Sequence, residues 1–243
     1  MRYMGGKHRQ GKKIAKFIND VSTENTTYVE PFCGALGVAC WVEPKCKILA
    51  DTSEALITMW TAFMYPCVEL PDVITEEVYN FHKSKRNPKD WMCAYVGFGM
   101  SFGGKWFGGY ARDKTGKTDF ARNLKKSIEI KRLMINKSDV EFVHSSYENL
   151  DFPNGSVIYC DPPYAGRTKA HNFDSFDHEK FWEWCRVKVS EGNTILVTEF
   201  IVPDDFVVLY DFGDTVVRHH NGKKPDGTRE VLVCHESQRW LWS

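Results

Sequence analysis

Short β-rich runs alternate with helix-periodic segments at both ends of this chain, and this alternation constrains its fold more than any other feature. Strands are expected at 26–30, 47–50, 140–143, 156–160 and 194–198, and helices at 8–21, 53–65 and 177–190. Strands that alternate with helices form parallel sheets. Further short strands near 206–210, 215–219 and 230–234 complete the sheet, with an antiparallel edge. The sequence therefore predicts an α/β fold.

Residues 66–138 interrupt this rhythm. Helical periodicity is expected near 75–85, 88–100 and 119–136, with a Gly- and aromatic-rich segment at 98–110, and no strand is evident. We therefore expect one domain made of residues 1–65 and 139–243, with 66–138 inserted as a mainly helical lobe.

Glycines follow the first expected strand in the sequence Glu30-Pro31-Phe32-Cys33-Gly34-Ala35-Leu36-Gly37. Glycine lets the backbone approach a ligand closely, and this stretch is expected to open a helix. Asp51 ends the next strand, 17 residues beyond Gly34, close to the spacing at which an acid binds ribose hydroxyls. Because G-x-G-x-x-G is absent, a nucleoside cofactor without phosphates fits better than a dinucleotide. A plain structural turn is the alternative interpretation.

Asp161-Pro162-Pro163-Tyr164 follows the apolar run at 156–160 and is the strongest chemical signal in the chain. Ligands of open α/β sheets bind at the carboxyl ends of strands. Two prolines fix the backbone and leave the Pro162 carbonyl as a rigid acceptor beside the Asp161 carboxylate. The alternative is a proline-stiffened strand exit.

Two adjacent acceptors suit an NH2 group. An exocyclic amine is a poor nucleophile because its lone pair is delocalised into the ring. Hydrogen bonds to two fixed oxygens favour a tetrahedral nitrogen and stabilise the positive charge that develops on methyl transfer. Tyr164 offers a face on which a base can stack.

A third motif, Tyr3-Met4-Gly5-Gly6-Lys7, places a lysine near the start of the first helix. In order and content, the three motifs, the acid at Asp51 and the inserted lobe resemble the Dam-type (D12 class, alpha-group) DNA adenine-N6 methyltransferases, including many phage enzymes. The resemblance is dense at 1–65 and 140–200, with a weaker echo at 221–224 and 228–232.

This resemblance implies a Rossmann-like sheet that binds S-adenosyl-L-methionine, and methyl transfer to N6 of a flipped adenine in double-stranded DNA. Tyr3 and Lys7 are expected near the methionine portion of the cofactor, and Asp51 at its ribose. The expected cofactor-binding residues are Tyr3, Lys7, Glu30, Pro31, Phe32, Cys33, Gly34, Gly37, Asp51 and Asp161. The expected catalytic residues are Asp161, Pro162, Pro163 and Tyr164, and no metal site is expected.

The chain departs from the family pattern at two places. Ser146-Tyr147 stands where the family usually has an acidic residue before an aromatic one. The segment 102–110 lacks the Asn-Gly-basic pattern often found in the recognition region, so the target sequence GATC is not predicted. Asp before Pro162 favours adenine over cytosine among family members. Alternative functions are an N4-cytosine or RNA adenine methyltransferase, or a catalytically inactive DNA-binding relative.

Charge is distributed unevenly, although the formal net charge is zero. Residues 101–137 contain ten basic and three acidic residues, a net charge of +7, interleaved with Gly and aromatic residues. This composition suits contacts to phosphates and bases. Some of Lys125, Lys126 and Lys131 are expected to form a solvated helix face. The expected DNA-binding residues are Lys105, Trp106, Phe107, Tyr110, Arg112, Lys114 and Arg122, with the three aromatics reading or wedging the gap left by the flipped base, and His171 and Asn172 are candidates for a lid.

Composition excludes several other classes. The chain has no apolar stretch of the roughly 18 residues that a membrane helix needs, and no signal-peptide pattern is seen at its start. Its eight cysteines form no C-x-x-C pair or zinc spacing, which indicates a reducing compartment and mostly buried thiols. We therefore expect a cytoplasmic protein of a bacterium or a phage-infected cell, with no obligate protein partner.

Overall fold

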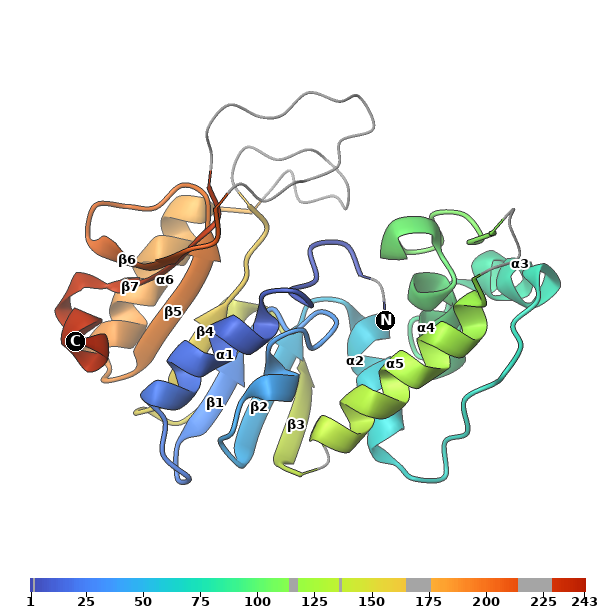
Figure 1. Cartoon of the computed structure of the whole chain (residues 1–243), viewed down its shortest axis with the longest axis horizontal. Coiled ribbons are helices and arrows are strands. Elements are labelled where there is room, and N and C mark those ends of the chain that lie inside the picture. The colour runs from blue at the N-terminus through green and yellow to red at the C-terminus, as the bar shows by residue number, and fades with distance from the viewer. Residues whose placement is uncertain (2, 114–117, 136, 165–175, 214–228) are drawn as a thin grey trace.

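A single mixed sheet of seven strands organises the computed structural model, which describes residues 1, 3–113, 118–135, 137–164, 176–213 and 229–243 (Figure 1). The strand order is β3-β2-β1-β4-β5-β7-β6. The neighbours from β3 to β5 pair in parallel, and β7 runs antiparallel to both β5 and β6. The expected Rossmann-like α/β class, with an antiparallel pairing near one edge, is confirmed.

The strands lie close to where the sequence pattern put them. They are β1 (Thr27–Glu30), β2 (Cys46–Asp51), β3 (Asp139–His144), β4 (Val157–Cys160), β5 (Thr194–Glu199), β6 (Phe206–Asp211) and β7 (Val231–His235). The strand expected at 215–219 lies outside the described residues. All four residues of β4 are buried, as expected for a strand covered on both faces.

The six α-helices of the described residues were also expected. They are α1 (Gly11–Asp20), α2 (Glu54–Met64), α3 (Glu76–Lys85), α4 (Trp91–Gly99), α5 (Phe120–Ile135) and α6 (His178–Ser190). Five begin after a residue whose side chain accepts a hydrogen bond from a backbone N–H in the first turn: Ser53, Thr75, Asp90, Asp119 and Asp177.

Residues 31–37 form the expected loop, but the α-helix that this loop was expected to open is not found. Only a short 3-10 turn, η1 (Ala39–Trp41), follows the loop. Gly34 and Leu36 have φ values of +43° and +56°, which an α-helix does not allow. The other 3-10 turns are η2 (Phe102–Gly104), η3 (Tyr147–Asn149) and η4 (Glu236–Trp242), the last at the end of the chain.

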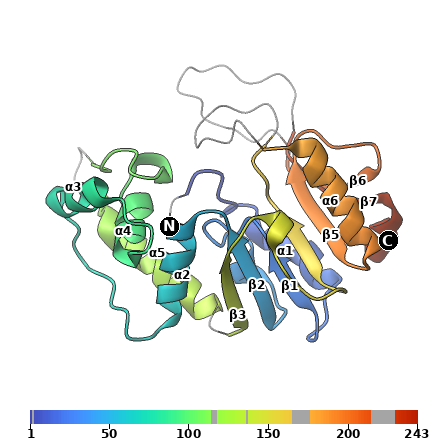
Figure 2. The same ribbon diagram turned by 180° about the vertical axis from the view of Figure 1, so that it is seen from behind.

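Helices cover both faces of the sheet. In Figure 1, α1 and α5 lie in front of the strands and α6 lies behind them; Figure 2 shows the reverse side. One core cluster joins α1, α2, α4 and α5 to the sheet, and the other joins α6 to residues on the opposite face of β1 and β4. Each face is thus sealed by apolar contact, which leaves the strand ends as the accessible part of the sheet.

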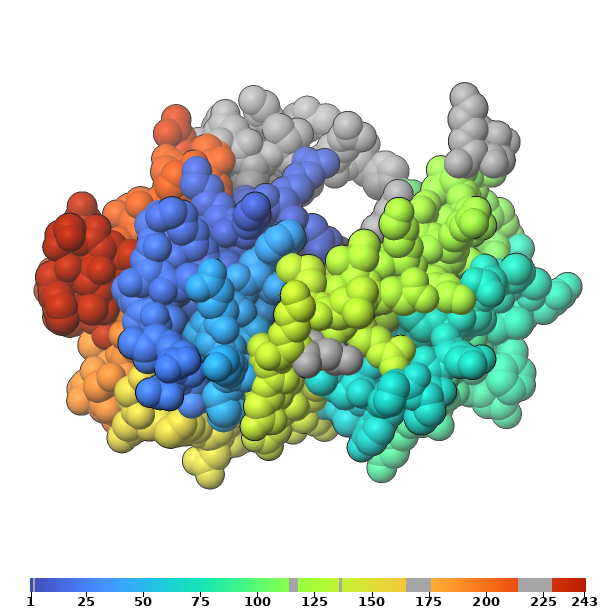
Figure 3. Space-filling view, turned by 60° about the horizontal axis from the view of Figure 1, so that its bottom comes forward, coloured from blue at the N-terminus to red at the C-terminus, as the bar shows by residue number. Residues whose placement is uncertain are grey.

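The helices of residues 66–138 are not a separate body. Leu124 and Ile128 of α5, and Tyr95 of α4, belong to the same buried cluster as the sheet residue Leu49. In the space-filling view, an opening lies between part of the N-terminal segment and the yellow-green α5 region (Figure 3), while the N-terminal amine of Met1 contacts Ser127 of α5. That this insertion is a DNA-recognition lobe is a proposal.

The order of the strands reverses between β1 and β4. β2 and β3 lie beyond β1 on one side of this point, and β5, β7 and β6 lie beyond β4 on the other side. Open α/β sheets bind ligands in the crevice outside the carboxyl ends of their strands at such a switch point. Glu30 ends β1 and Asp161 follows β4, so both lie at this position.

Candidate active site

The carboxyl ends of three neighbouring strands bring three acidic residues to one edge of the sheet. Glu30 ends β1, Asp51 ends β2, and Asp161 follows the last residue of β4. A buried lysine, Lys7, from the segment before α1 enters the same region. Lys7 and Asp161, which meet here, are 154 positions apart in the sequence.

Asp161 is held by three donors that meet at one of its oxygens. Its Oδ1 lies 2.7 Å from Lys7 Nζ, 2.7 Å from the Tyr164 hydroxyl and 3.0 Å from Thr198 Oγ1. Thr198 is in turn hydrogen-bonded to the Tyr159 hydroxyl at 2.9 Å. Within the described residues, no hydrogen bond engages Oδ2. The carboxylate is thus fixed at one oxygen, and its other oxygen can accept a further donor.

Glu230 is a second carboxylate in this network. It is 4% exposed, and Lys7 Nζ lies 3.0 Å from its Oε1. Gln10 donates to Oε2 at 2.8 Å, and the Tyr164 hydroxyl lies 2.6 Å from Oε1. Because that hydroxyl has one proton, it donates to either Asp161 or Glu230 while it accepts from Lys7.

The charge states follow from this arrangement. Burial opposes the charge of Lys7, but Asp161 and Glu230 together raise its pKa above the ordinary value. Burial also opposes the charge of Glu230, but Lys7 and three hydrogen bonds keep its pKa below the ordinary value. Burial and both carboxylates raise the pKa of Tyr164 well above its usual range. At neutral pH Lys7 is therefore an ammonium, Glu230 a carboxylate and Tyr164 a protonated phenol.

The glycine loop after β1 is fixed by its neighbours. Asp51 Oδ2 accepts from the backbone N–H of Gly34 at 3.0 Å, and the Trp60 indole N–H donates to the Gly34 carbonyl at 2.9 Å. Asp51 Oδ1 accepts from the N–H of Ser53 at 2.8 Å. Asp51, expected at a ribose, is also the residue that connects the loop to β2.

Gly34 is required where it lies. Its φ of +43° disfavours any residue with a side chain, and an added Cβ would lie 3.1 Å from the ring of Tyr3. The Tyr3 ring contacts Phe98 of α4, with centroids 5.6 Å apart, and Phe98 contacts Trp106 at 4.6 Å. Aromatic contacts thus run from the glycine loop into the insertion.

Gly37 lets the Lys7 segment approach the loop. An added Cβ at Gly37 would lie 3.0 Å from the backbone N of Lys7, and one at Gly11 would lie 1.9 Å from the Gly37 carbonyl oxygen. Close backbone packing therefore places Lys7 beside the strand ends.

Three other expected cofactor residues are at least partly enclosed. Pro31 and Cys33 are buried, and the N–H of Cys33 donates to the Ala50 carbonyl at 2.8 Å. The Phe32 ring packs against Tyr147 and Phe181, with centroids 5.7 Å and 5.9 Å apart. Tyr147, the aromatic of the Ser146-Tyr147 departure, therefore supports Phe32.

Glu30 is an unusual acid because it is 3% exposed. The Tyr28 hydroxyl donates to its Oε2 at 2.8 Å. Burial is the main cause that raises the pKa of Glu30 to about 8, and Asp161 adds to the effect. At neutral pH the ligand-free site therefore holds this carboxyl group largely neutral.

We expect Glu30→Gln to change how stability depends on pH. With a folded-state pKa above the unfolded-state value of 4.5, Glu30 binds more protons when folded, so its contribution to stability falls as pH rises from about 4.5 to about 8. Glutamine keeps the acceptor for Tyr28 but cannot ionise. The free energy of unfolding of the variant, measured relative to the wild type by urea titration, should therefore rise by a few kcal/mol between pH 5 and pH 8. A difference that stays constant over this range would contradict a raised pKa.

The expected DNA-binding residues differ in how far they are exposed. Lys105 and Arg122 are exposed, and Arg112 is exposed but paired with Glu76. Trp106 is partly buried, and Phe107 is 4% exposed. The Tyr110 hydroxyl donates to the Ile74 carbonyl at 2.7 Å. Lys114, His171 and Asn172 lie outside the described residues.

Aromatic side chains that we expected to read or wedge DNA are therefore packed against other residues of the insertion. The Phe107 ring lies 5.3 Å from Tyr79 and 4.7 Å from Trp106, centroid to centroid. Insertion of Phe107 into a base stack would require this segment to open. That role stays a prediction, and Lys105 and Arg122 are better placed to reach phosphates.

Sequence reasoning gave no role to Glu230, Thr198 or Gln10. Glu230 falls in the weaker echo at 228–232, which was the one available signal. By pattern, Thr198 lies in an expected strand and Gln10 in an expected helix, and neither stands in a motif. Their part in the site arises from contacts across the fold, such as the one that joins residues 10 and 230.

Within the described residues, no group of three or more His, Cys, Asp or Glu side chains is arranged to hold a metal ion. In the same part of the chain, no helix combines the length and apolar character needed to cross a membrane.

Comparisons with known proteins agree with this geometry. A family model described as D12 class N6 adenine-specific DNA methyltransferase matches residues 3–91 and 107–212. These ranges include the Lys7 segment, the glycine loop, Asp51 and the Asp161–Tyr164 loop.

A curated relative, the Type II methyltransferase M.FokI of Planomicrobium okeanokoites, is 22% identical over 215 residues, which cover 77% of this chain and 32% of that protein. The chain thus spans about one third of the length of that relative. Two solved structures of the rRNA methyltransferase aviRa from Streptomyces viridochromogenes align over 93% of this chain and 85% of theirs, with TM-scores of 0.41 and 0.37 and identities of 10% and 11%. That similarity is too low to argue from.

Proposed function

The chain belongs to the D12 class of N6 adenine-specific DNA methyltransferases, and on that premise we propose that it transfers the methyl group of S-adenosylmethionine to N6 of an adenine flipped out of duplex DNA. The observation that carries the proposal is Asp161. It lies at the switch point of the sheet, fixed at Oδ1 by Lys7, Tyr164 and Thr198.

The residues around the glycine loop suit S-adenosylmethionine. The Asp51 carboxylate can accept hydrogen bonds from ribose hydroxyls while it holds Gly34. Glu30 and Asp161 bring carboxyl groups toward a cofactor that carries a positive sulfonium, and approach of that charge would favour ionisation of Glu30. When bound, the cofactor supplies an electrophilic methyl group.

Asp161 and Pro162 would hold the nucleophile. The free Oδ2 of Asp161 and the Pro162 carbonyl can each accept one N–H of the exocyclic amine, which aligns the nitrogen lone pair and stabilises its developing positive charge. Lys7 and Thr198 keep the carboxylate from rotating. Because the Lys7 ammonium is balanced by Asp161 and Glu230 together, the site remains anionic toward the amine.

Duplex DNA would enter from the side of the insertion. N6 is inaccessible in a stacked base pair, so the base must be extruded, at a cost of about a few kcal/mol. The +7 segment at 101–137 supplies positive charge for phosphate contacts. A cytoplasmic role in a bacterium or phage-infected cell, within or outside a restriction system, is compatible with this activity.

Analysis of the modified nucleoside tests the proposal. The purified protein is incubated with S-adenosylmethionine carrying a deuterated methyl group and with unmethylated plasmid DNA, which is then digested to nucleosides for mass spectrometry. We expect deuterated N6-methyl-2′-deoxyadenosine from the DNA, and no labelled N6-methyladenosine when RNA replaces the DNA. Labelled N4-methylcytosine alone would indicate the cytosine alternative, and cofactor binding without transfer would indicate an inactive relative.

Lys105 provides a test of the DNA interface. We expect Lys105→Ala to weaken binding about equally to all sequences and to reduce the slope of log K against log salt by about one. Fluorescence anisotropy between 50 and 200 mM salt measures both, with Lys16→Ala on the exposed face of α1 as the control. An unchanged slope would remove Lys105 from the interface.

A further inference from the structure

Lys131 of α5 is directed toward the glycine loop rather than toward solvent. It is 7% exposed, and its Nζ donates to the carbonyl of Ala35 and, at 3.0 Å, to that of Leu36. Lys131 is therefore not among the residues of the solvated helix face that was expected for some of Lys125, Lys126 and Lys131. Its contacts cross 96 positions, from the insertion to the loop after β1.

Together with Asp51 and Trp60, Lys131 forms hydrogen bonds to the backbone of three consecutive loop residues. Asp51 and Trp60 fix the N–H and the carbonyl of Gly34, and Lys131 fixes the next two carbonyls. The loop needs this support because Leu36 has a φ of +56°, a conformation that non-glycine residues rarely adopt. Among the described residues, Lys131 has no ion pair, so its polar partners are the two loop carbonyls.

We propose that Lys131 is a positioning residue through which the inserted segment holds the glycine loop in the shape that binds S-adenosylmethionine. The inference rests on the proposed function, because it takes this loop as the cofactor site. It assigns α5 two tasks: packing of the insertion against the sheet, and control of cofactor affinity from a position that need not touch the cofactor.

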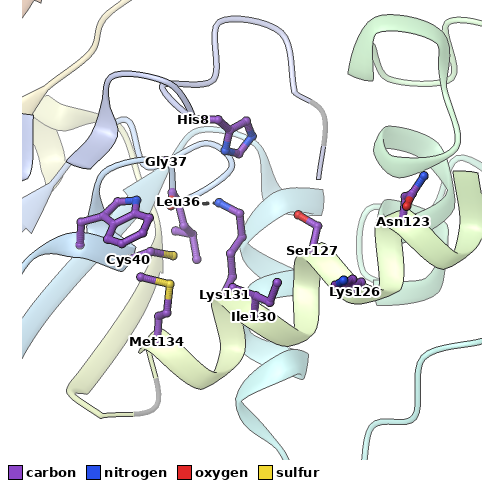
Figure 4. Close-up of a pocket in the computed structure, with 11 residues that line it drawn as sticks. His8, Leu36, Gly37, Cys40, Asn123, Lys126, Ser127, Ile130, Lys131 and Met134 are labelled. Atoms are coloured by element: carbon purple, nitrogen blue, oxygen red, sulfur yellow. Dashed lines mark hydrogen bonds between the residues drawn. The ribbon is translucent and has the colours of Figure 1, made fainter. Parts of the chain in front are cut away.

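The surroundings of Lys131 make the proposal testable with a small molecule. A cavity of about 310 Å³ lies between α5 and the loop, and Lys131 lines it together with His8, Leu36, Cys40, Trp41 and Met134 (Figure 4). Figure 4 shows the Lys131 side chain rising from α5 toward Leu36. Removing this side chain enlarges a space that n-propylammonium, which matches the atoms lost in Lys131→Ala, can enter.

The test measures S-adenosylmethionine affinity by isothermal titration calorimetry. We expect Lys131→Ala and Lys131→Met to weaken binding by about tenfold or more, because each leaves two loop carbonyls without their charged donor. In steady-state assays, KM for the cofactor should rise by a similar factor, while kcat at saturating cofactor stays within about twofold. Lys125→Ala, on the same helix in an exposed pair with Asp72, is the matched control and should bind like the wild type.

Amine rescue separates the ammonium from simple packing. Millimolar n-propylammonium should restore cofactor affinity to Lys131→Ala but not to Lys131→Met, whose side chain fills the space. Thermal unfolding in parallel shows whether each variant is folded. If Lys131→Ala is unfolded, the cofactor affinity of Lys131→Met tests the proposal.

Wild-type affinity in folded Lys131→Met, or weakened binding in Lys131→Ala that the amine does not restore, would overturn the inference. If the wild-type protein itself bound no S-adenosylmethionine, the proposed function would fail instead.

Discussion

Asp161→Ala is expected to reduce methyl transfer by about a thousandfold or more while leaving DNA affinity within about twofold. The substitution removes one of the two oxygens proposed to hold the amine. The alanine side chain has no group that could make this contact in the transition state. The fold should survive because Lys7 keeps Glu230 as its partner at 3.0 Å. Transfer of labelled methyl groups into plasmid DNA measures the rate, and fluorescence anisotropy measures DNA binding.

Two further variants sharpen this test. Asp161→Asn keeps one acceptor oxygen but can present an NH2 group to the substrate amine, so it should also be strongly impaired. Asp20→Asn changes a carboxylate in an exposed pair with Lys16 on α1 and should retain full activity. Turnover near the wild-type rate in Asp161→Ala would contradict the mechanism.

Lys7→Met is expected to destabilise the protein by about 3 kcal/mol near pH 8, since it leaves the buried carboxylates of Asp161 and Glu230 facing one another without their cation. The deficit should depend on pH. Glu230 has a lowered pKa in the wild type and contributes stability above its ordinary pKa; without Lys7, repulsion and burial raise the carboxyl pKa values. The deficit should therefore be small near pH 4 and should grow as pH rises.

A double variant checks this cause. Lys7→Met with Glu230→Gln removes one of the two opposed charges and should recover most of the stability lost at pH 8. Urea unfolding at pH 5 and pH 8 supplies the four free energies of the cycle at each pH. A deficit equal at both pH values, or a double variant no more stable than Lys7→Met, would show that lost packing rather than charge is responsible.

The chemical part of the site was predictable because its residues are local in sequence. Asp161-Pro162-Pro163-Tyr164 is one tetrapeptide at the end of a buried strand, and the glycine loop and Asp51 stand at spacings that follow from consecutive strands. Glu230 and Thr198 could not be predicted in the same way. They reach Asp161 or Lys7 only because β5 and β7 pair beside β4, and local patterns contain no information on such contacts.

Burial explains why composition was a poor guide to the side chains of the insertion. Aromatic and basic residues between 98 and 137 have the composition of a DNA-binding surface, but composition does not tell which side chains face inward. Phe107 packs against Tyr79, and Lys131 points into the interior. Both residues are fixed by contacts with α3, α4 or the glycine loop, so their orientation follows from tertiary packing.

The secondary structure was predictable where hydrophobic periodicity was strong, as in α5 and β4. It failed just after the loop that follows β1, where an α-helix was expected and only a short 3-10 turn is found; the loop itself contains two positive φ values. The loop is stabilised by Asp51, Trp60 and Lys131, all distant in sequence, and their hydrogen bonds outweigh local helix preference.

A structure of the protein with duplex DNA and a non-reactive S-adenosylmethionine analogue tests the central claim most directly. We expect an extruded adenine whose N6 lies within hydrogen-bond distance of the Asp161 carboxylate and the Pro162 carbonyl, with the sulfonium position of the analogue in line behind it. A complex in which protein side chains fill that corner, leaving no room for a nucleobase beside Asp161, would contradict the account.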